Sequence, residues 1–305
     1  MIIPKFHRLA CQSLAGVLLA LCPLPSIMAE GLDVEKTKLE AAKGDAEAQF
    51  ILGRAYFRGE GVPQSDAKAV ELYRKSAEQG NFKAQNNLGS MYALGRGVKA
   101  DFAEAARWFR KSAEQGTALA QNNLALAFAK GDGVPKDRKE AMVWFRRAAE
   151  QGLAAAQNSL GELYYFGEDG VQKDHNEALK WFEKAAEQGL AEAQNNMAVM
   201  YQHGYGGAVG GAPAAVRWLQ KAAEQGNAKA QSNLGAAYWD GNGVKADHAK
   251  AFMWLKLGSL QKEATAFNLL ADVREGMTKA EIEEGERLVG EFQKRSTMSN
   301  AVPKP

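Results

Sequence analysis

Asparagine amides recur along this chain at a fixed spacing and are its most regular candidates for binding chemistry. Asn86, Asn122, Asn158 and Asn195 are separated by 36, 36 and 37 residues. Because an amide offers both donors and an acceptor, a row of them can hydrogen-bond the backbone of an extended peptide. The alternatives are that these amides are solvated, or that they bond neighbouring copies of the same structural unit.

The histidines do not form a catalytic or metal-binding pattern. The chain contains no HExxH, GxSxG, P-loop or CxxC spacing. His175 and His248 directly follow aspartates, His203 precedes a glycine, and His7 lies near the N-terminus. We therefore expect no catalytic residue, no metal and no cofactor.

The element that positions the asparagines is a block of about 36 residues that occurs six times. Its most constant residue is a glutamine after an alanine: Gln49, Gln85, Gln121, Gln157, Gln194 and Gln231. A Leu or Met follows at +3, a Gly or Ala at +4 and a Tyr or Phe at +7. This stripe predicts one face of a helix, on which the small residue lets a second helix approach closely. Self-similarity at this period predicts a solenoid.

A second helix follows a GxGV turn in most copies. Its expected N-caps are Ser65, Asp101, Asp137, Asp174 and Asp247, and we predict capping boxes with Glu104, Glu140 and Glu177. The fifth copy replaces the turn with a glycine-rich stretch, residues 205–213, and has Gly211 where an N-cap acid is expected. This predicts a mobile loop, which serves as a hinge, as a contact site, or only marks a degraded repeat.

The repeated block resembles the Sel1-like repeats, a subgroup of the tetratricopeptide-like helical repeats. The shared pattern is AEQGxxxAQxxLGxxYxxGxGVxxDxxxAxxWFxKA, read from Ala77 onward, and it covers roughly residues 41 to 258. The resemblance implies an all-α, right-handed α-solenoid whose first helices line a concave, partner-binding groove. The cysteine-rich branch of the family would imply one disulfide in each repeat. Here Cys11 and Cys22 precede the repeats, which weakens any transfer of penicillin binding or β-lactamase activity.

The N-terminus has the features of a secretory leader. Lys5 and Arg8 precede an apolar run that is too short to span a bilayer comfortably, and Ala29 is the expected last residue before cleavage. Lipid attachment at Cys22 is disfavoured by the large Leu21 before it. The sequence therefore predicts a periplasmic or secreted protein with no membrane span after cleavage.

The domain boundaries follow from these features. We predict a signal peptide at 1–29, an N-terminal capping helix at 30–44, C-terminal capping helices at 259–295 with a capping box from Thr278 to Glu281, and a disordered tail at 296–305. The six repeats are expected at 45–80, 81–116, 117–152, 153–189, 190–226 and 227–258.

Composition gives little support to a charged partner. The chain is 46% hydrophobic and 24% charged, as in ordinary soluble proteins. Lys5 and Arg8 belong to the leader, and the rest of the chain has 36 basic and 36 acidic residues. Nucleic acid and anionic lipid are therefore not expected partners.

The expected binding surface is the face of the first helices opposite their packing stripe. The candidate residues are Phe50, Arg54, Phe57, Asn86, Asn122, Leu126, Asn158, Glu162, Tyr165, Asn195, Val199 and Trp239. Exposed aromatic and leucine side chains beside amides suit partner contact. The alternative is that Phe57, Tyr165 and Trp239 pack into the next repeat.

These features together predict a non-enzymatic scaffold that binds a partner protein or extended peptide, as an adaptor or regulator of a cell-envelope process. Two alternatives remain open from the sequence. One is a cell-wall-directed hydrolase of the β-lactamase type, and the other is a secreted factor that acts on a host.

Overall fold

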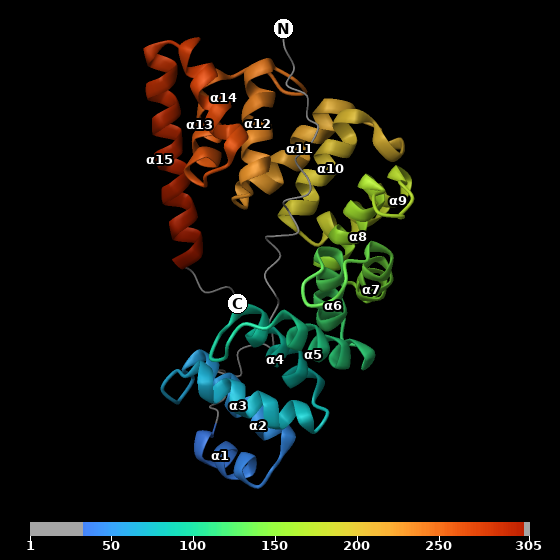
Figure 1. Cartoon of the computed structure of the whole chain (residues 1–305). Coiled ribbons are helices and arrows are strands. Elements are labelled where there is room, and N and C mark those ends of the chain that lie inside the picture. Colours follow the sequence, from blue (N-terminus) through green and yellow to red (C-terminus); the bar gives the residue numbers. More distant parts are fainter. Residues whose placement is uncertain (1–32, 302–305) are drawn as a thin grey trace. The chain divides into compact units, whose positions relative to one another are not determined.

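The structure is a computed structural model that describes residues 33–301. Over this range the chain forms helices joined by short turns, without a β-strand (Figure 1). The expected leader, with His7, Cys11 and Cys22, lies outside the described residues, as do residues 302–305. The prediction of an all-α helical-repeat fold is confirmed.

The chain divides after Lys173 into two compact units, which are described separately. The first unit contains α1 (Val34–Ala42), α2 (Ala46–Arg58), α3 (Asp66–Glu78), α4 (Phe82–Leu94), α5 (Phe102–Glu114), α6 (Ala118–Lys130), α7 (Arg138–Glu150) and α8 (Ala154–Phe166). The second contains α9 (His175–Glu187), α10 (Ala191–His203), the 3-10 helix η3 (Tyr205–Gly207), α11 (Gly211–Glu224), α12 (Ala228–Asp240), α13 (His248–Leu260), α14 (Ala264–Glu275) and α15 (Lys279–Ala301).

Each repeat contributes one helix that carries the constant glutamine and one that follows its turn. We name the former the A helices (α2, α4, α6, α8, α10 and α12) and the latter the B helices (α3, α5, α7, α9, α11 and α13). In the first unit one buried apolar cluster joins α2 to α5 and contains Tyr73, Leu88 and Trp108. In the second unit another joins α10 to α13 and contains Leu234 and Trp254.

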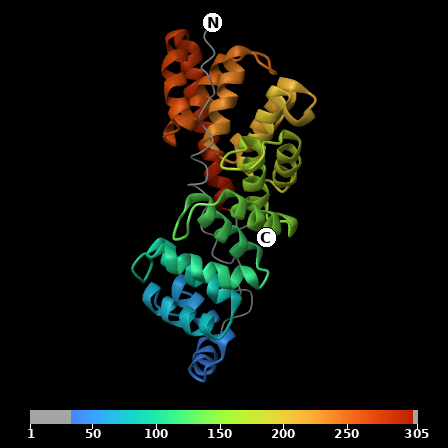
Figure 2. The ribbon, with the colours of Figure 1, turned by 45° about the vertical axis from the view of Figure 1, so that its right-hand side comes forward.

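Helices outside the repeats cover the ends of the core. Ala41 of α1 packs with Ala48 and Leu52 of α2. In the second unit α15 lies along α13, as both views show (Figures 1 and 2), and Val289 is buried between them. The helix α15 extends to Ala301 and so continues past residue 296, where we expected a disordered tail to begin.

The expected N-caps of the B helices are confirmed, but the capping boxes with Glu104 and Glu140 are not formed. The Asp101 side chain accepts from the Glu104 N–H at 3.0 Å. The Asp101 N–H already donates to the Tyr92 carbonyl at 3.0 Å, so the Glu104 carboxylate is not needed there. Instead it accepts from Arg107, which holds the pKa of Glu104 below its usual range, and from Trp108 Nε1 at 2.8 Å.

Glu140 likewise accepts from Trp144 Nε1 at 2.9 Å, and Glu177 accepts from Lys180 Nζ at 2.7 Å. The predicted box that opens α15 does form. The Thr278 N–H donates to the Glu281 carboxylate at 2.8 Å, and the Glu281 N–H donates to Thr278 Oγ1 at 3.3 Å.

Two glycine positions of the repeat are set by close approach of backbone or ring. A Cβ added at Gly89 on α4 would lie 2.7 Å from the Phe109 ring of α5, which explains the small residue at that position. The second glycine of the GxGV turn is more constrained. At Gly133, φ is +73° and an added Cβ would lie 2.1 Å from the carbonyl oxygen of Phe102.

Glutamine side chains connect successive repeats. Gln121 on α6 is buried; its Nε2 donates to the Ala113 carbonyl of α5 at 3.3 Å. Its Oε1 accepts from Gln151 Nε2, which follows α7, at 2.7 Å. We call this arrangement the glutamine bridge. It recurs at Gln49 with Gln79, Gln85 with Gln115, Gln194 with Gln225 and Gln231 with Gln261.

The glycine-rich loop of the fifth repeat is held by an aromatic contact at its start. The Tyr205 ring lies 4.3 Å from the His175 ring and 5.1 Å from the His203 ring, measured between centroids. The helix α11 begins one residue earlier than expected, so its N-cap is Gly210 and not Gly211. Val209, beyond the tyrosine, is 88% exposed. The expected mobility of this loop remains a prediction.

Replacing Gly133 with Ala should lower the thermal stability of the chain strongly. The left-handed backbone and the overlap with Phe102 together should cost about 3 kcal/mol. The matched control is Gly116→Ala, because φ there is +92° and an added Cβ meets nothing within 4 Å. Scanning calorimetry of both variants checks this; equal losses would show that the Phe102 contact is unimportant.

Replacing Gln121 with Leu should also destabilise the chain. The variant removes two hydrogen bonds of a buried side chain, one to the Ala113 carbonyl and one from Gln151 Nε2, at a cost of about 2 kcal/mol. The control is Gln64→Leu, whose exposed amide donates to the Phe57 carbonyl at 3.0 Å. We expect its melting temperature to stay close to that of the parent, and a comparable fall in both variants would contradict a special role for the bridge.

Candidate functional site

The twelve predicted contact residues all lie on the A helices, but the structure buries more than half of them. The buried members are Phe50, Arg54, Asn86, Asn122, Leu126, Asn158 and Asn195. The half-buried members are Phe57, Glu162, Tyr165, Val199 and Trp239. The expectation of an exposed aromatic and leucine surface is therefore wrong for Phe50 and Leu126, although the role of this face in binding remains a prediction.

The burial of the apolar members has a clear cause, which is packing against neighbouring helices. The Phe50 ring lies 5.9 Å from the Tyr73 ring of α3. Phe57 is covered by the Arg96 guanidinium of the next repeat, 4.3 Å above its ring. Trp239 stacks on His248 of α13, with 4.3 Å between ring centroids. For Phe57 and Trp239, packing against following elements is thus the arrangement found.

The asparagine amides bond between repeats at two places. Asn123 Nδ2 on α6 donates to Asn86 Oδ1 on α4 at 3.0 Å. Asn233 Nδ2 on α12 donates to Asn195 Oδ1 on α10, also at 3.0 Å. Asn158 instead donates to Glu162 one turn later on α8, at 3.1 Å. Bonding between neighbouring repeats, one of the alternatives raised by the sequence, therefore accounts for part of the series.

Two amide oxygens on α6 do not receive a hydrogen bond. Asn122 Oδ1 and Asn123 Oδ1 are both enclosed, and neither has a donor. Each residue is only 1% exposed. Buried acceptors in native proteins are nearly always bonded, so these two oxygens are a departure from the usual pattern on α6.

The sequence analysis did not identify the glutamine bridge or the contacts of Trp108 and Trp144. The glutamines had served there only to define the repeat register. The sequence does contain a regular spacing that could have indicated the bridge. Gln121 and Gln151 are 30 residues apart, and so are Gln85 and Gln115. Trp108 and Trp144 each donate to a glutamate and lie under a cation, Lys111 or Arg147, so their polar groups are already satisfied.

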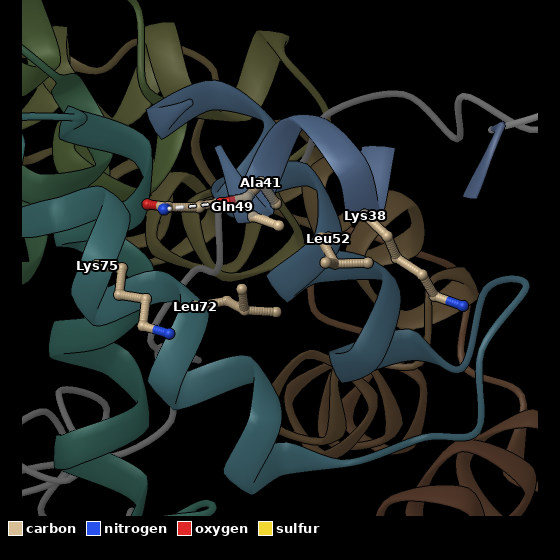
Figure 3. A pocket seen from close by; sticks show the side chains of 7 residues that line it. Lys38, Ala41, Gln49, Leu52, Leu72 and Lys75 are labelled. Atoms are coloured by element: carbon tan, nitrogen blue, oxygen red, sulfur yellow. Dashed lines mark hydrogen bonds between the residues drawn. The ribbon is translucent and has the colours of Figure 1, made fainter. Parts of the chain in front are cut away.

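A hollow of about 420 Å³ lies between α1, α2 and α3 (Figure 3). Leu52 and Leu72 line it, and the Gln49 amide beside it is bonded to the Ala41 carbonyl at 3.2 Å. Lys38 and Lys75 stand at its rim, but each is paired with a glutamate on its own helix, Glu35 or Glu71. This hollow therefore offers an open apolar surface without a free charge.

Within residues 33–301 the titratable side chains do not form a metal-binding cluster. In the described part of the chain, no three His, Cys, Asp or Glu side chains are placed to hold a metal ion. The His248 ring bonds Glu281 at 3.0 Å, and the Thr278 backbone N–H is the main cause of the lowered Glu281 pKa. Among residues 33–301, no helix has the length and apolar character that a membrane crossing requires.

Comparisons with known proteins agree with the repeat architecture. The Sel1 repeat matches six times, at residues 46–81, 82–117, 118–153, 154–190, 191–227 and 228–262. The chain is 34% identical to a Sel1 repeat protein from Oxalobacter formigenes, over 74% of this chain and 94% of that one, with a TM-score of 0.67.

A second similar structure is a protective antigen present in uropathogenic Escherichia coli strains, which displays an SLR fold. It is 28% identical over 89% of this chain and 67% of that chain, with a TM-score of 0.58. Comparison with curated proteins gives no match. Sel1 repeat proteins are helical scaffolds for protein interaction and are typically non-catalytic. The glutamine-defined helix pairs and the six matched segments together establish that this chain belongs to the Sel1 repeat family.

Proposed function

We propose that this protein is a secreted or periplasmic scaffold that binds an extended segment of a partner protein along its A helices. It acts as an adaptor or regulator of a cell-envelope process and has no catalytic activity of its own. The observation that carries the proposal is the pair of unbonded oxygens, Asn122 Oδ1 and Asn123 Oδ1, on the buried face of α6.

Unbonded buried acceptors favour a ligand that brings its own donors. Leaving one buried acceptor unpaired costs about 1–3 kcal/mol, so each oxygen gains when a donor reaches it. An extended peptide presents backbone N–H groups at regular intervals, and Asn122 Oδ1 is the acceptor of the candidate face that lacks a donor. The half-buried residues of α8, Glu162 and Tyr165, are the candidates for side-chain contacts.

The proposed location depends on the N-terminal leader described from the sequence. Lys5 and Arg8, the apolar run after them and Ala29 have the order of a cleavable secretory signal. A host-facing role is the second candidate function. It is favoured by the similarity to the protective antigen of uropathogenic Escherichia coli, at 28% identity over 89% of this chain.

Cell fractionation distinguishes the two candidates. We expect the chain in the periplasmic fraction, with Glu30 as its first residue when its N-terminus is determined by mass spectrometry. Recovery of the cleaved chain mainly from the culture medium would favour the host-facing role. Recovery of a chain that retains Met1 in the cytosol would contradict secretion altogether.

Site-specific photocrosslinking tests the binding face. A photoreactive phenylalanine analogue in place of Tyr165 should crosslink one partner in intact cells, and Asn122→Ala in the same chain should reduce the yield about tenfold. The control places the same analogue at Phe267 of α14, which is 67% exposed and lies in the other unit. Equal capture from both positions, or capture unaffected by Asn122→Ala, would reject this face as the binding site.

A further inference from the structure

Arg54 on α2 is a buried cation without a partner. Two arginines are buried in the described part of the chain, Arg54 at 3% exposed and Arg138 at 9%. Arg138 forms ion pairs with Glu168 at 2.9 Å and with Asp169 at 3.1 Å. The Nε and Nη1 atoms of Arg54 are enclosed and have no hydrogen-bond partner.

Arg58 and Asp66, which act on Tyr73 together with Arg54, are already paired with other groups. Arg58 pairs with Glu60 at 3.3 Å, and Arg96 pairs with Asp66 at 2.9 Å. The Tyr73 hydroxyl lies close enough to feel the Arg54 charge, but burial raises the pKa of Tyr73 to about 12. The phenol therefore stays neutral at physiological pH and does not compensate the guanidinium.

The fold does not require a cation at this position. The equivalent residues of the other repeats are Ser90, Leu126, Glu162, Val199 and Ala236. Leu126 is as deeply buried as Arg54, at 4% exposed, so an apolar side chain fits there. An unpaired buried guanidinium is unfavourable, and breaking a local rule of this kind is typical of functional positions.

The surroundings of Arg54 suit one planar anion. Phe50 and Phe57 are four residues before and three after it, so all three lie on one face of α2. Arg54 as a whole is 3% exposed, and Nε and Nη1 are its two enclosed nitrogens without a partner. A carboxylate matches the fixed fork of an arginine with two parallel hydrogen bonds.

We propose that Arg54 forms an anion-binding subsite in the first repeat, which receives one carboxylate of an extended peptide bound along the A helices. The inference rests on the proposed function and deepens it, because it names the chemical class of the partner segment. The carboxylate comes from an Asp or Glu side chain or from a free C-terminus. The two sources are separated by the choice of peptide.

The test uses three short synthetic peptides of equal length and the purified chain. The first is acetylated and amidated and has a single glutamate between two runs of alanine. The second has glutamine in place of that glutamate, and the third is an acetylated polyalanine peptide with a free C-terminus. Binding is measured by calorimetric titration and by the shift of the melting temperature. We expect the parent to bind one of the two carboxylate peptides at least tenfold more tightly than the glutamine peptide, and the peptide preferred identifies the source.

Variants at position 54 separate binding from structure. Arg54→Leu should abolish the preference for the carboxylate. It should also raise the melting temperature of the free chain, because the equivalent position of the third repeat holds a buried leucine, Leu126. Arg54→Lys should keep part of the preference, since it retains the charge but loses the fork. Arg58→Leu, which removes an exposed and already paired cation, should leave the preference unchanged.

Three results would overturn the inference. They are the absence of any preference in the parent, a preference that survives in Arg54→Leu, and a lower melting temperature for Arg54→Leu, which would make Arg54 structural. The crosslinking experiment at position 165 is independent of these. A partner captured there without a carboxylate preference would uphold the proposed function and reject the subsite. A carboxylate preference without a partner captured at position 165 would reject the proposed face.

Discussion

The hydrogen bonds of the glutamine bridge are the interaction on which the arrangement of repeats depends. Each bridging glutamine donates to a carbonyl at the end of the preceding helix, where backbone acceptors have no partner within the helix. It also accepts from the glutamine after the next B helix, as Gln121 does from Gln151. One buried side chain thus connects three successive helices, and a slip in register would leave both of its polar ends unpaired.

Close backbone approach is the second constraint, and it acts with the first. At Gly133 a turn passes so near the start of the preceding B helix that no side chain fits. At Gly89 the Phe109 ring of the B helix occupies the space that a side chain would need. Helices held at such small separations restrict which residues fit at these positions.

The buried polar groups of the first unit differ in whether they have hydrogen-bond partners. The aspartate caps and the glutamate–tryptophan pairs complete their partners within the first unit. Arg54, Asn122 and Asn123 do not. Natural sequences usually satisfy buried polar atoms, and departures concentrate at sites that serve a ligand at some cost in stability. These three residues lie on A helices of the same unit, α2 and α6.

The period of the sequence was sufficient to predict the repeats, their helix pairs and most of their caps. N-cap aspartates, turn glycines and apolar stripes act over a few residues, so their consequences can be read locally. The capping boxes failed for Glu104 and Glu140 because the N-cap N–H had already found a carbonyl nine residues earlier, as Asp101 does at Tyr92. That bond depends on how the turn folds back, which spacing alone does not show.

The sequence by itself thus determined the family pattern, the helix content and the candidate face, because these follow from the 36-residue period and from local backbone chemistry. Only the tertiary structure decided which residues of that face are buried and which are bonded. Asn86 meets Asn123 across 37 residues, and Arg54 is enclosed while Arg138 is paired. The reason is that the burial and hydrogen bonding of a residue depend on the side chains that the neighbouring repeat places beside it. They cannot be deduced from the residue's own position in the repeat.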